Sequence, residues 1–313
     1  MAKVPYSKRA LNYADQLQKL ISRGLKIENV EKTLHLLEQI SYYRLSGYWY
    51  PLLEEPKSEH KFKEGASFET VFQIYLFDKE LRKFFQAELE KIEISVRAKI
   101  IYEFWHGYDA FWFSDNQHFK SSTKLSVLLS KLGDLVSKSD DDFIKSFNEK
   151  YIEPLPPACM ILEVSSFGNL SSIYSNLKGG NREKRNIANY YGLDENTFAS
   201  WLHSFTYLRN LCAHHSRLWN RVMKISPLVP QKPKRPFINN VDLPNIQDPK
   251  NPFKTNTRVY YLLSMVVYLM DVINPNHHVK EKFFDLMTNY PMIDIKSLGF
   301  PANWEKEPFW MQK

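Results

Sequence analysis

The stretch that decides the fold runs from Trp201 to Arg221 and reads WLHSFTYLRNLCAHHSRLWNR. Side chains suited to burial recur in it and just beyond it at steps of three and four residues, the spacing of one buried face of an α-helix. The members of this face are Trp201, Phe205, Leu208, Leu211, Cys212, His215, Leu218, Trp219 and Val222. We therefore predict a single amphipathic helix through the whole stretch, with His215 partly buried and hydrogen-bonded.

A second face of this predicted helix is polar and carries Asn210, His214, Arg217 and Arg221. We expect His214 to be accessible to a ligand and Asn210, one turn earlier, to fix its tautomer. Arg209 precedes His214 by five residues, so on an ideal helix the two differ by about 140° and about 7.5 Å of rise. A shared site then requires long side chains that converge on a ligand, a distorted helix, or a second copy of the motif across a dimer.

An arginine and a histidine in this arrangement have the chemistry for RNA cleavage without a metal. A neutral imidazole can take a proton from a ribose 2′-hydroxyl or give one to a leaving 5′-oxygen. A guanidinium can hold the phosphate through two hydrogen bonds and stabilise its developing charge. The products are a 2′,3′-cyclic phosphate and a 5′-hydroxyl, and DNA is not cut because it lacks the 2′-hydroxyl. The same spacing also arises by chance on solvated basic helices, so that alternative stays open.

A family resemblance extends beyond this motif. The string YLRNLCAHHSRLWNR, residues 207–221, closely resembles the Abi family of bacterial abortive-infection proteins, in particular its AbiD/AbiF-like group. Further stretches resemble the same family in the same order, so that the resemblance covers nearly the whole chain. They are ISYYRLSGYWYP at 40–51, EISVRA at 93–98, LEVSSFGNL at 162–170 and GFPANW at 299–304.

This resemblance carries expectations for fold, site and partners. The Abi family is similar to the HEPN superfamily, whose members are all-α and often carry R-x(4–6)-H as a ribonuclease motif. It implies that Arg209 and His214 are the catalytic pair and that Asn210 is the polar residue after the arginine. HEPN nucleases usually combine two motifs in one site, so one clear copy implies a homodimer. Members are described as phage-defence toxins, some paired with a small antitoxin RNA, and we expect no cofactor.

The helical patterns of the rest of the chain predict an all-α bundle with an N-terminal helical extension and a C-terminal helical cap, and the resemblance implies that this bundle is HEPN-like. We expect the extension at 1–60 and a core with the R-x4-H motif at 61–225, which includes a long helix from about residue 68 to 105. Seven prolines at 226–257 indicate an irregular excursion. C-terminal helices at 258–313 then complete the bundle.

Composition constrains the compartment more than the activity. The net charge of +7 agrees with phosphate binding, but proteins that never bind nucleic acid reach similar values. Only Cys159 and Cys212 are present, so no disulfide framework is indicated. The N-terminus lacks the apolar core of a signal peptide, and the most apolar run, 259–273, is too short to span a bilayer. We expect a cytoplasmic protein without membrane association.

Other arginines are secondary candidates for RNA contacts. Arg44 lies in the aromatic run YYRLSGYWY, which is either a platform for stacked bases or a turn packed on the bundle. Arg97 follows Glu93 by one helical turn, so it either forms an ion pair or faces a phosphate. The remaining candidates are Arg182 and Arg185 in a small basic cluster, and Arg217 and Arg221 after the motif.

The sequence therefore predicts a metal-independent endoribonuclease toxin of a phage-defence system. His214 is the expected general acid and base, Arg209 the phosphate clamp and Asn210 the orienting residue. The alternative is a non-catalytic RNA- or protein-binding HEPN-like module in phage defence. A zinc site at Cys212 and His215 is not expected, because a second Cys or His pair at finger spacing is missing.

Overall fold

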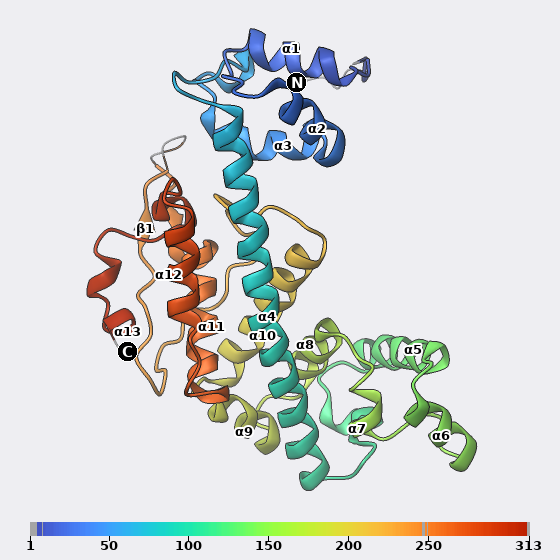
Figure 1. Ribbon diagram of the computed structural model, residues 1–313. Coiled ribbons are helices and arrows are strands. Elements are labelled where there is room, and N and C mark those ends of the chain that lie inside the picture. Colours follow the sequence, from blue (N-terminus) through green and yellow to red (C-terminus); the bar gives the residue numbers. More distant parts are fainter. Residues whose placement is uncertain (1–4, 8, 246–247, 249, 312–313) are drawn as a thin grey trace. The chain divides into compact units, whose positions relative to one another are not determined.

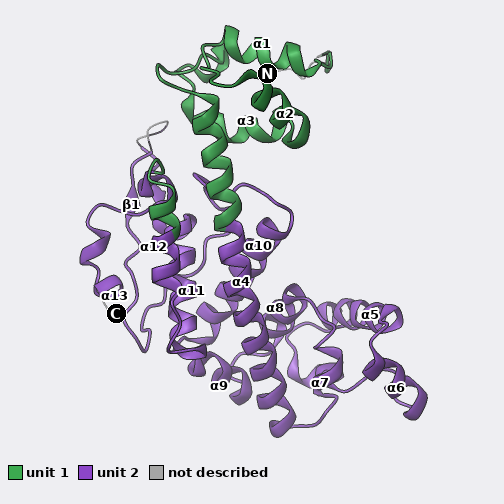
Figure 2. Cartoon of the chain, in the orientation of Figure 1, with its two compact units in different colours: residues 1–81, 286–293 green, residues 82–285, 294–313 purple. Residues whose placement is uncertain are grey.

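A computed structural model describes residues 5–7, 9–245, 248 and 250–311, and helices dominate it (Figure 1). This confirms the predicted all-α fold. The chain forms two compact units, one of residues 1–81 and 286–293 and one of residues 82–285 and 294–313 (Figure 2). The four segments expected from the sequence do not coincide with these units, and their boundaries stay predictions.

The first unit is built from short N-terminal helices. They are α1 (Tyr13–Ser22), α2 (Val30–Ile40), α3 (Tyr42–Trp49), η1 (Tyr50–Leu52) and η2 (Lys57–Glu59). Two long helices, α4 (Phe68–Gly107) and α12 (Val279–Asn289), contribute residues to both units. The extent of α4 confirms the long helix predicted from about 68 to 105.

The second unit holds the remaining elements. Its α-helices are α5 (Ser122–Lys138), α6 (Asp142–Lys150), α7 (Ala158–Ile161), α8 (Phe167–Asn176), α9 (Arg182–Tyr190), α10 (Glu195–Ala213), α11 (Val259–Ile273) and α13 (Pro308–Met311). Single-turn 3-10 helices are η3 (Trp112–Ser114), η4 (Asn116–His118), η5 (Thr255–Thr257), η6 (Ile295–Leu298) and η7 (Trp304–Lys306). Two short strands, β1 (Asp242–Leu243) and β2 (Phe253–Lys254), pair antiparallel.

The aromatic run at 42–50 is mainly structural. Tyr48 and Trp49 are buried in the first unit, and the Tyr48 hydroxyl donates to Asp78 Oδ2 at 2.8 Å. Tyr42 meets the Trp49 ring edge-on at 4.9 Å. The sequence of this run allows two interpretations, a platform for stacked bases or packed aromatic side chains. Tyr48 and Trp49 fit the second interpretation because they are buried, whereas Tyr43 is exposed.

The core of the second unit forms around α11. Every side chain from Val259 to Met270 is buried, as expected for an apolar helix enclosed by its neighbours. Trp201 of α10 packs edge-on against Tyr268 of α11, with ring centroids 5.5 Å apart. The C-terminal tail also docks here, because Trp310 Nε1 donates to the Tyr260 hydroxyl at 3.0 Å. In the described part of the chain, no helix combines the length and apolar content needed to cross a bilayer.

The described residues of the proline-rich segment, 226–245, 248 and 250–257, are irregular up to η5 apart from the strand pair, and they pack against α10. Phe237 contacts the Trp201 ring at 5.1 Å, and Trp201 Nε1 donates to the carbonyl of Leu228 at 2.9 Å. The segment therefore covers an apolar side of α10.

The predicted helix 201–221 is wrong in its second half, because α10 ends at Ala213. His215 adopts a left-handed conformation, with φ of 54°. The amide of Ser216 then donates to the carbonyl of Leu211 at 2.8 Å, and the amide of His215 donates to that of Cys212 at 3.0 Å. This pair of bonds is a Schellman motif, which satisfies the last carbonyls of a helix and turns the chain away.

Candidate functional site

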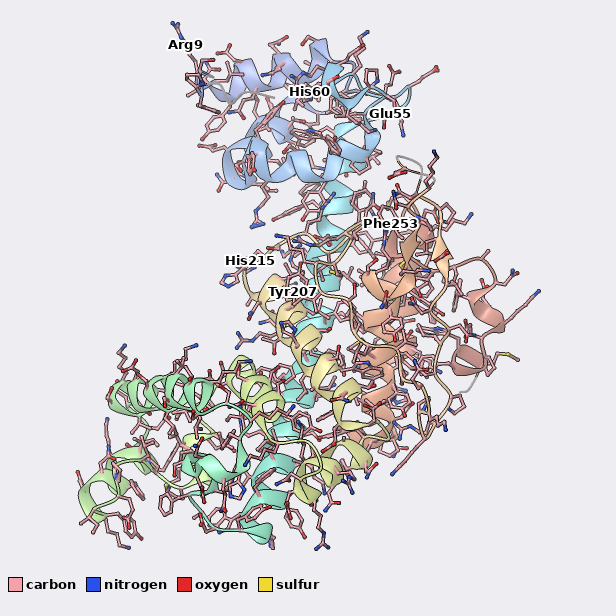
Figure 3. All side chains as sticks on the ribbon, turned by 180° about the vertical axis from the view of Figure 1, so that it is seen from behind. Arg9, Glu55, His60, Tyr207, His215 and Phe253 are labelled. Carbon is pink, nitrogen blue, oxygen red and sulfur yellow. The ribbon has the colours of Figure 1, made fainter. Side chains whose placement is uncertain are left out.

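The helix end gives the two adjacent histidines different backbone positions. His214 is the C-cap of α10 and His215 is the left-handed residue after it. Both side chains are exposed, and Figure 3 shows the ring of His215 at the end of α10, directed away from the ribbon. The prediction that His215 is partly buried is therefore wrong, because the chain leaves the helix before this residue. The prediction that His214 is accessible is confirmed.

Arg209 and Asn210 lie directly before this helix end. Arg209 Nη1 donates to Asn210 Oδ1 at 3.3 Å, and the amide of His214 donates to the backbone carbonyl of Asn210 at 3.0 Å. Asn210 therefore orients the guanidinium, and its expected role in fixing the tautomer of His214 stays a prediction. In the described residues Arg209 forms no ion pair within bonding distance, so most of its N–H groups remain available to a phosphate.

The predicted pair Glu93–Arg97 on α4 lies close to this arginine. Arg97 Nη2 contacts Glu93 Oε1 at 2.9 Å, Arg97 Nη1 contacts Glu163 at 3.3 Å, and Arg97 donates to the carbonyl of Ser165 at 3.1 Å. Burial raises the pKa of the Glu93 carboxyl, while the positive charges of Arg97 and Arg209 act to lower it. Arg97 is thus committed to two carboxylates, and Glu93 stabilises the charge on Arg209.

A second group of arginines follows the helix end. Arg221 Nη1 donates to the carbonyl of Arg217 at 3.1 Å. Arg258, which is only 6% exposed, donates to the carbonyl of Ser297 at 2.7 Å and to Asn220 Oδ1 at 3.4 Å. Burial, and then the positive charge of Arg217, lower the pKa of the Arg258 guanidinium to about 10. A positive field therefore gathers beside the turn that carries His214, as an anion site requires.

Arg258 was missed at the sequence level, although a local signal exists. It is the N-cap residue of α11, where the helix dipole disfavours a positive charge. Gly299, at φ of +87°, allows the close packing, because a Cβ there would lie 2.2 Å from the Cβ of Arg258. An arginine where a helix start disfavours it indicates a tertiary role, but only the fold reveals which one.

Two of the other predicted RNA contacts, Arg182 and Arg185, lie on a different helix from the motif. Arg182 and Arg185 are exposed on α9, which leads into the first turn of α10, whereas Arg209 lies near the last turn. Arg44 lies on α3 of the first unit. All three stay predictions. Cys212 is buried, as expected for the apolar face, and no three metal-binding side chains gather among the residues that the structure describes.

Comparison with known proteins identifies a family. The model of a family described as Abi-like protein matches residues 35–220. The matched segment includes α10 and the turn that follows it, up to Asn220. No curated protein and no solved structure matches the chain.

The Glu93–Arg97 contact predicts a pH-dependent loss of stability in the variant Arg97→Met. This change removes the positive charge of Arg97, one of the two that lower the pKa of Glu93. Only the charge of Arg209 then acts in that direction, so the already raised pKa of Glu93 rises further. A carboxyl whose pKa is raised by folding destabilises the protein above its unfolded pKa of about 4.3 and not below it. We expect the free energy of unfolding to fall by about 1–3 kcal/mol at neutral pH, and by much less near pH 4, in urea titrations.

The control is Lys145→Met, which breaks the exposed ion pair between Lys145 on α6 and Asp140. Its loss should be much smaller at neutral pH. A deficit for Arg97→Met that is equal at both pH values would show that lost packing, not the charge of Glu93, causes it.

Proposed function

The chain belongs to the Abi-like protein family, and from this premise we propose that it is a metal-independent endoribonuclease that acts in phage defence. One observation carries the catalytic part of the proposal. An exposed histidine, His214, caps the same helix end at which Arg209 presents a guanidinium with open donors. His214 still follows the helical ladder, because its amide donates to the carbonyl of Asn210 at 3.0 Å. The two side chains therefore flank the helix end, and their length lets them converge on one ligand.

Each side chain has a separate role in this mechanism. The imidazole of His214 takes the proton of a ribose 2′-hydroxyl, and the 2′-oxygen attacks the adjacent phosphorus. The bond from phosphorus to the 5′-oxygen breaks as that oxygen takes a proton from the protonated imidazole, and it leaves as a 5′-hydroxyl. Arg209, oriented by Asn210, donates to the phosphate oxygens as charge develops on them. The products are a 2′,3′-cyclic phosphate and a 5′-hydroxyl.

Positive charge around the turn supports phosphate binding. Arg217 and Arg258 lie close enough for their charges to interact, and Arg221 bonds to the backbone of Arg217. We propose that Arg217 and Arg221 contact the RNA backbone near the cleaved bond, whereas the buried Arg258 acts through its field. Arg97 is not included, because its two carboxylates already neutralise it.

We further propose that the active form is a homodimer. In a monomer the single His214 would have to act as both base and acid, whereas two copies of the motif at one site would supply two histidines. An apolar stripe on α4 supports this assembly. Ile94, Tyr102 and Trp105 are 54%, 55% and 39% exposed, and their spacing of eight and three residues places them on one side of the helix. Arg97, which borders this stripe in sequence, belongs to the cluster around Arg209. A second copy on the stripe would bring two motifs to one region.

The catalytic assignment predicts which variants lose cleavage. Purified protein in EDTA should cut single-stranded RNA and leave 5′-hydroxyl ends. His214→Ala should lower the rate by about 100-fold or more, and Arg209→Ala by about 100- to 1,000-fold, with unchanged helical circular dichroism. The control His215→Asn keeps a residue that tolerates the left-handed conformation and should retain the rate. RNA binding without any cleavage by the wild type would instead favour a non-catalytic binding module.

The dimer is tested by Ile94→Glu, measured by light scattering after size-exclusion chromatography. We expect the wild type to elute as a dimer, the variant as a folded monomer, and cleavage to fall with the dimer fraction. Ile152→Glu is the control, because Ile152 is 98% exposed and lies outside α4. A monomeric wild type that cleaves RNA at full rate would refute the assembly.

A further inference from the structure

A groove on the second unit lies apart from the residues assigned so far. It has a volume of about 700 Å³ and is bounded by α5, α8 and α10, which Figure 1 shows as neighbours. Its lining includes two lysines, an amide, two hydroxyls and a histidine, contributed by Lys124, Lys131, Asn169, Ser172, Ser200 and His203. Three different helices therefore build one site, in which these polar groups stand beside apolar lining residues such as Val127 and Leu128.

The charge of the groove is entirely positive. None of its lining residues is a carboxylate. Lys124 and Lys131 are seven residues apart on α5, so they lie on one side of that helix about 10 Å apart. Both are exposed, and within the described residues neither ammonium group forms an ion pair with the protein. Two uncompensated ammonium groups along a groove suit a ligand with more than one negative charge.

The opposite wall supplies groups that bind bases and sugars. His203 is exposed, and its ring has no hydrogen-bond partner in the part of the chain that the structure describes. Asn169 presents an amide there, and Ser172 presents a hydroxyl that also donates to the carbonyl of Gly168 at 2.8 Å. A ring that stacks, beside amide and hydroxyl groups, is typical of single-strand recognition.

The groove and the candidate catalytic site lie along the same helix, α10. His203 and Asn210 are seven residues apart on α10, and both are on its exposed side. Seven residues correspond to two turns and about 10 Å along the axis. At a rise of about 3.4 Å per nucleotide in a stacked strand, this distance is about three nucleotides. A strand with its cleaved bond at Arg209 and His214 therefore reaches the groove within a few nucleotides.

We propose that this groove is a subsite for single-stranded RNA that flanks the cleaved bond. Lys124 and Lys131 contact backbone phosphates, and His203 contacts a base. The volume lies within the range of pockets that hold drug-sized ligands, which fits roughly one or two nucleotides of a single strand and not a duplex. This inference rests on the proposed ribonuclease function, whose site it extends.

The test measures RNA binding, so that its outcome does not depend on RNA cleavage. The full chain carrying His214→Ala is titrated against a fluorescent single-stranded RNA of about twelve nucleotides, alone and combined with Lys124→Glu and Lys131→Glu. We expect the charge reversals to weaken binding by about 10-fold or more. The slope of log affinity against log salt should fall by about 0.7 for each lost phosphate contact. The neutral double variant Lys124→Gln with Lys131→Gln should give a smaller loss of affinity. It replaces the charge-reversed variant in the test if that variant does not fold.

The control pair, Lys138→Glu with Lys150→Glu, makes the same charge change on exposed residues outside the groove. Equal losses in both pairs, no loss in either, or no RNA binding at all would overturn the subsite. With His214 intact, cleavage of the long RNA should fall in the groove variant, whereas cleavage of a dinucleotide should not change. Groove-dependent binding by a wild type that never cleaves would refute the ribonuclease and retain the subsite.

Discussion

The hydrogen bond from the Ser216 amide to the Leu211 carbonyl is the constraint on which the site depends. It closes α10 at Ala213 and makes His214 the cap of the helix. The amide of His214 still donates to the carbonyl of Asn210, so Arg209 and His214 flank this helix end in directions about 140° apart. The same turn sends the chain back into the unit, where Leu218 and Trp219 are buried. One backbone arrangement therefore both exposes the histidine and anchors the segment after it.

The arginines near this turn have different electrostatic surroundings and therefore different roles. Arg97 is neutralised by Glu93 and Glu163, so it stabilises the fold and the position of α4 against the turn after α7. Arg258 lies buried without a carboxylate partner in the described residues, and its pKa is lowered first by burial and then by the positive charge of Arg217. Such an arrangement costs stability unless an anion binds beside it, which is the reason to expect phosphate there.

Periodicity predicted the all-α fold, the long helix α4 and the buried helix α11, because these features depend on local apolar spacing. The helix that periodicity predicted through residue 221 is wrong after Ala213, and the reason is physical. Leu218 and Trp219 are buried, so they extend the apolar pattern even though their backbone is not helical. No glycine or proline marks the turn, and a histidine in the left-handed region is uncommon. The positions of Arg258 and of the lysine-lined groove follow from tertiary packing, which local spacing does not report.

The most direct test of the central claim uses the substrate and not a variant. A single-stranded RNA is first cut by the protein in EDTA, and its preferred bond is identified. The same RNA is then made with one 2′-deoxyribose directly before that bond. If the 2′-oxygen is the nucleophile, cleavage at that bond disappears while other bonds are still cut with 5′-hydroxyl ends. Cleavage of the deoxy-substituted bond, or products with 5′-phosphates, would contradict the mechanism assigned to His214 and Arg209.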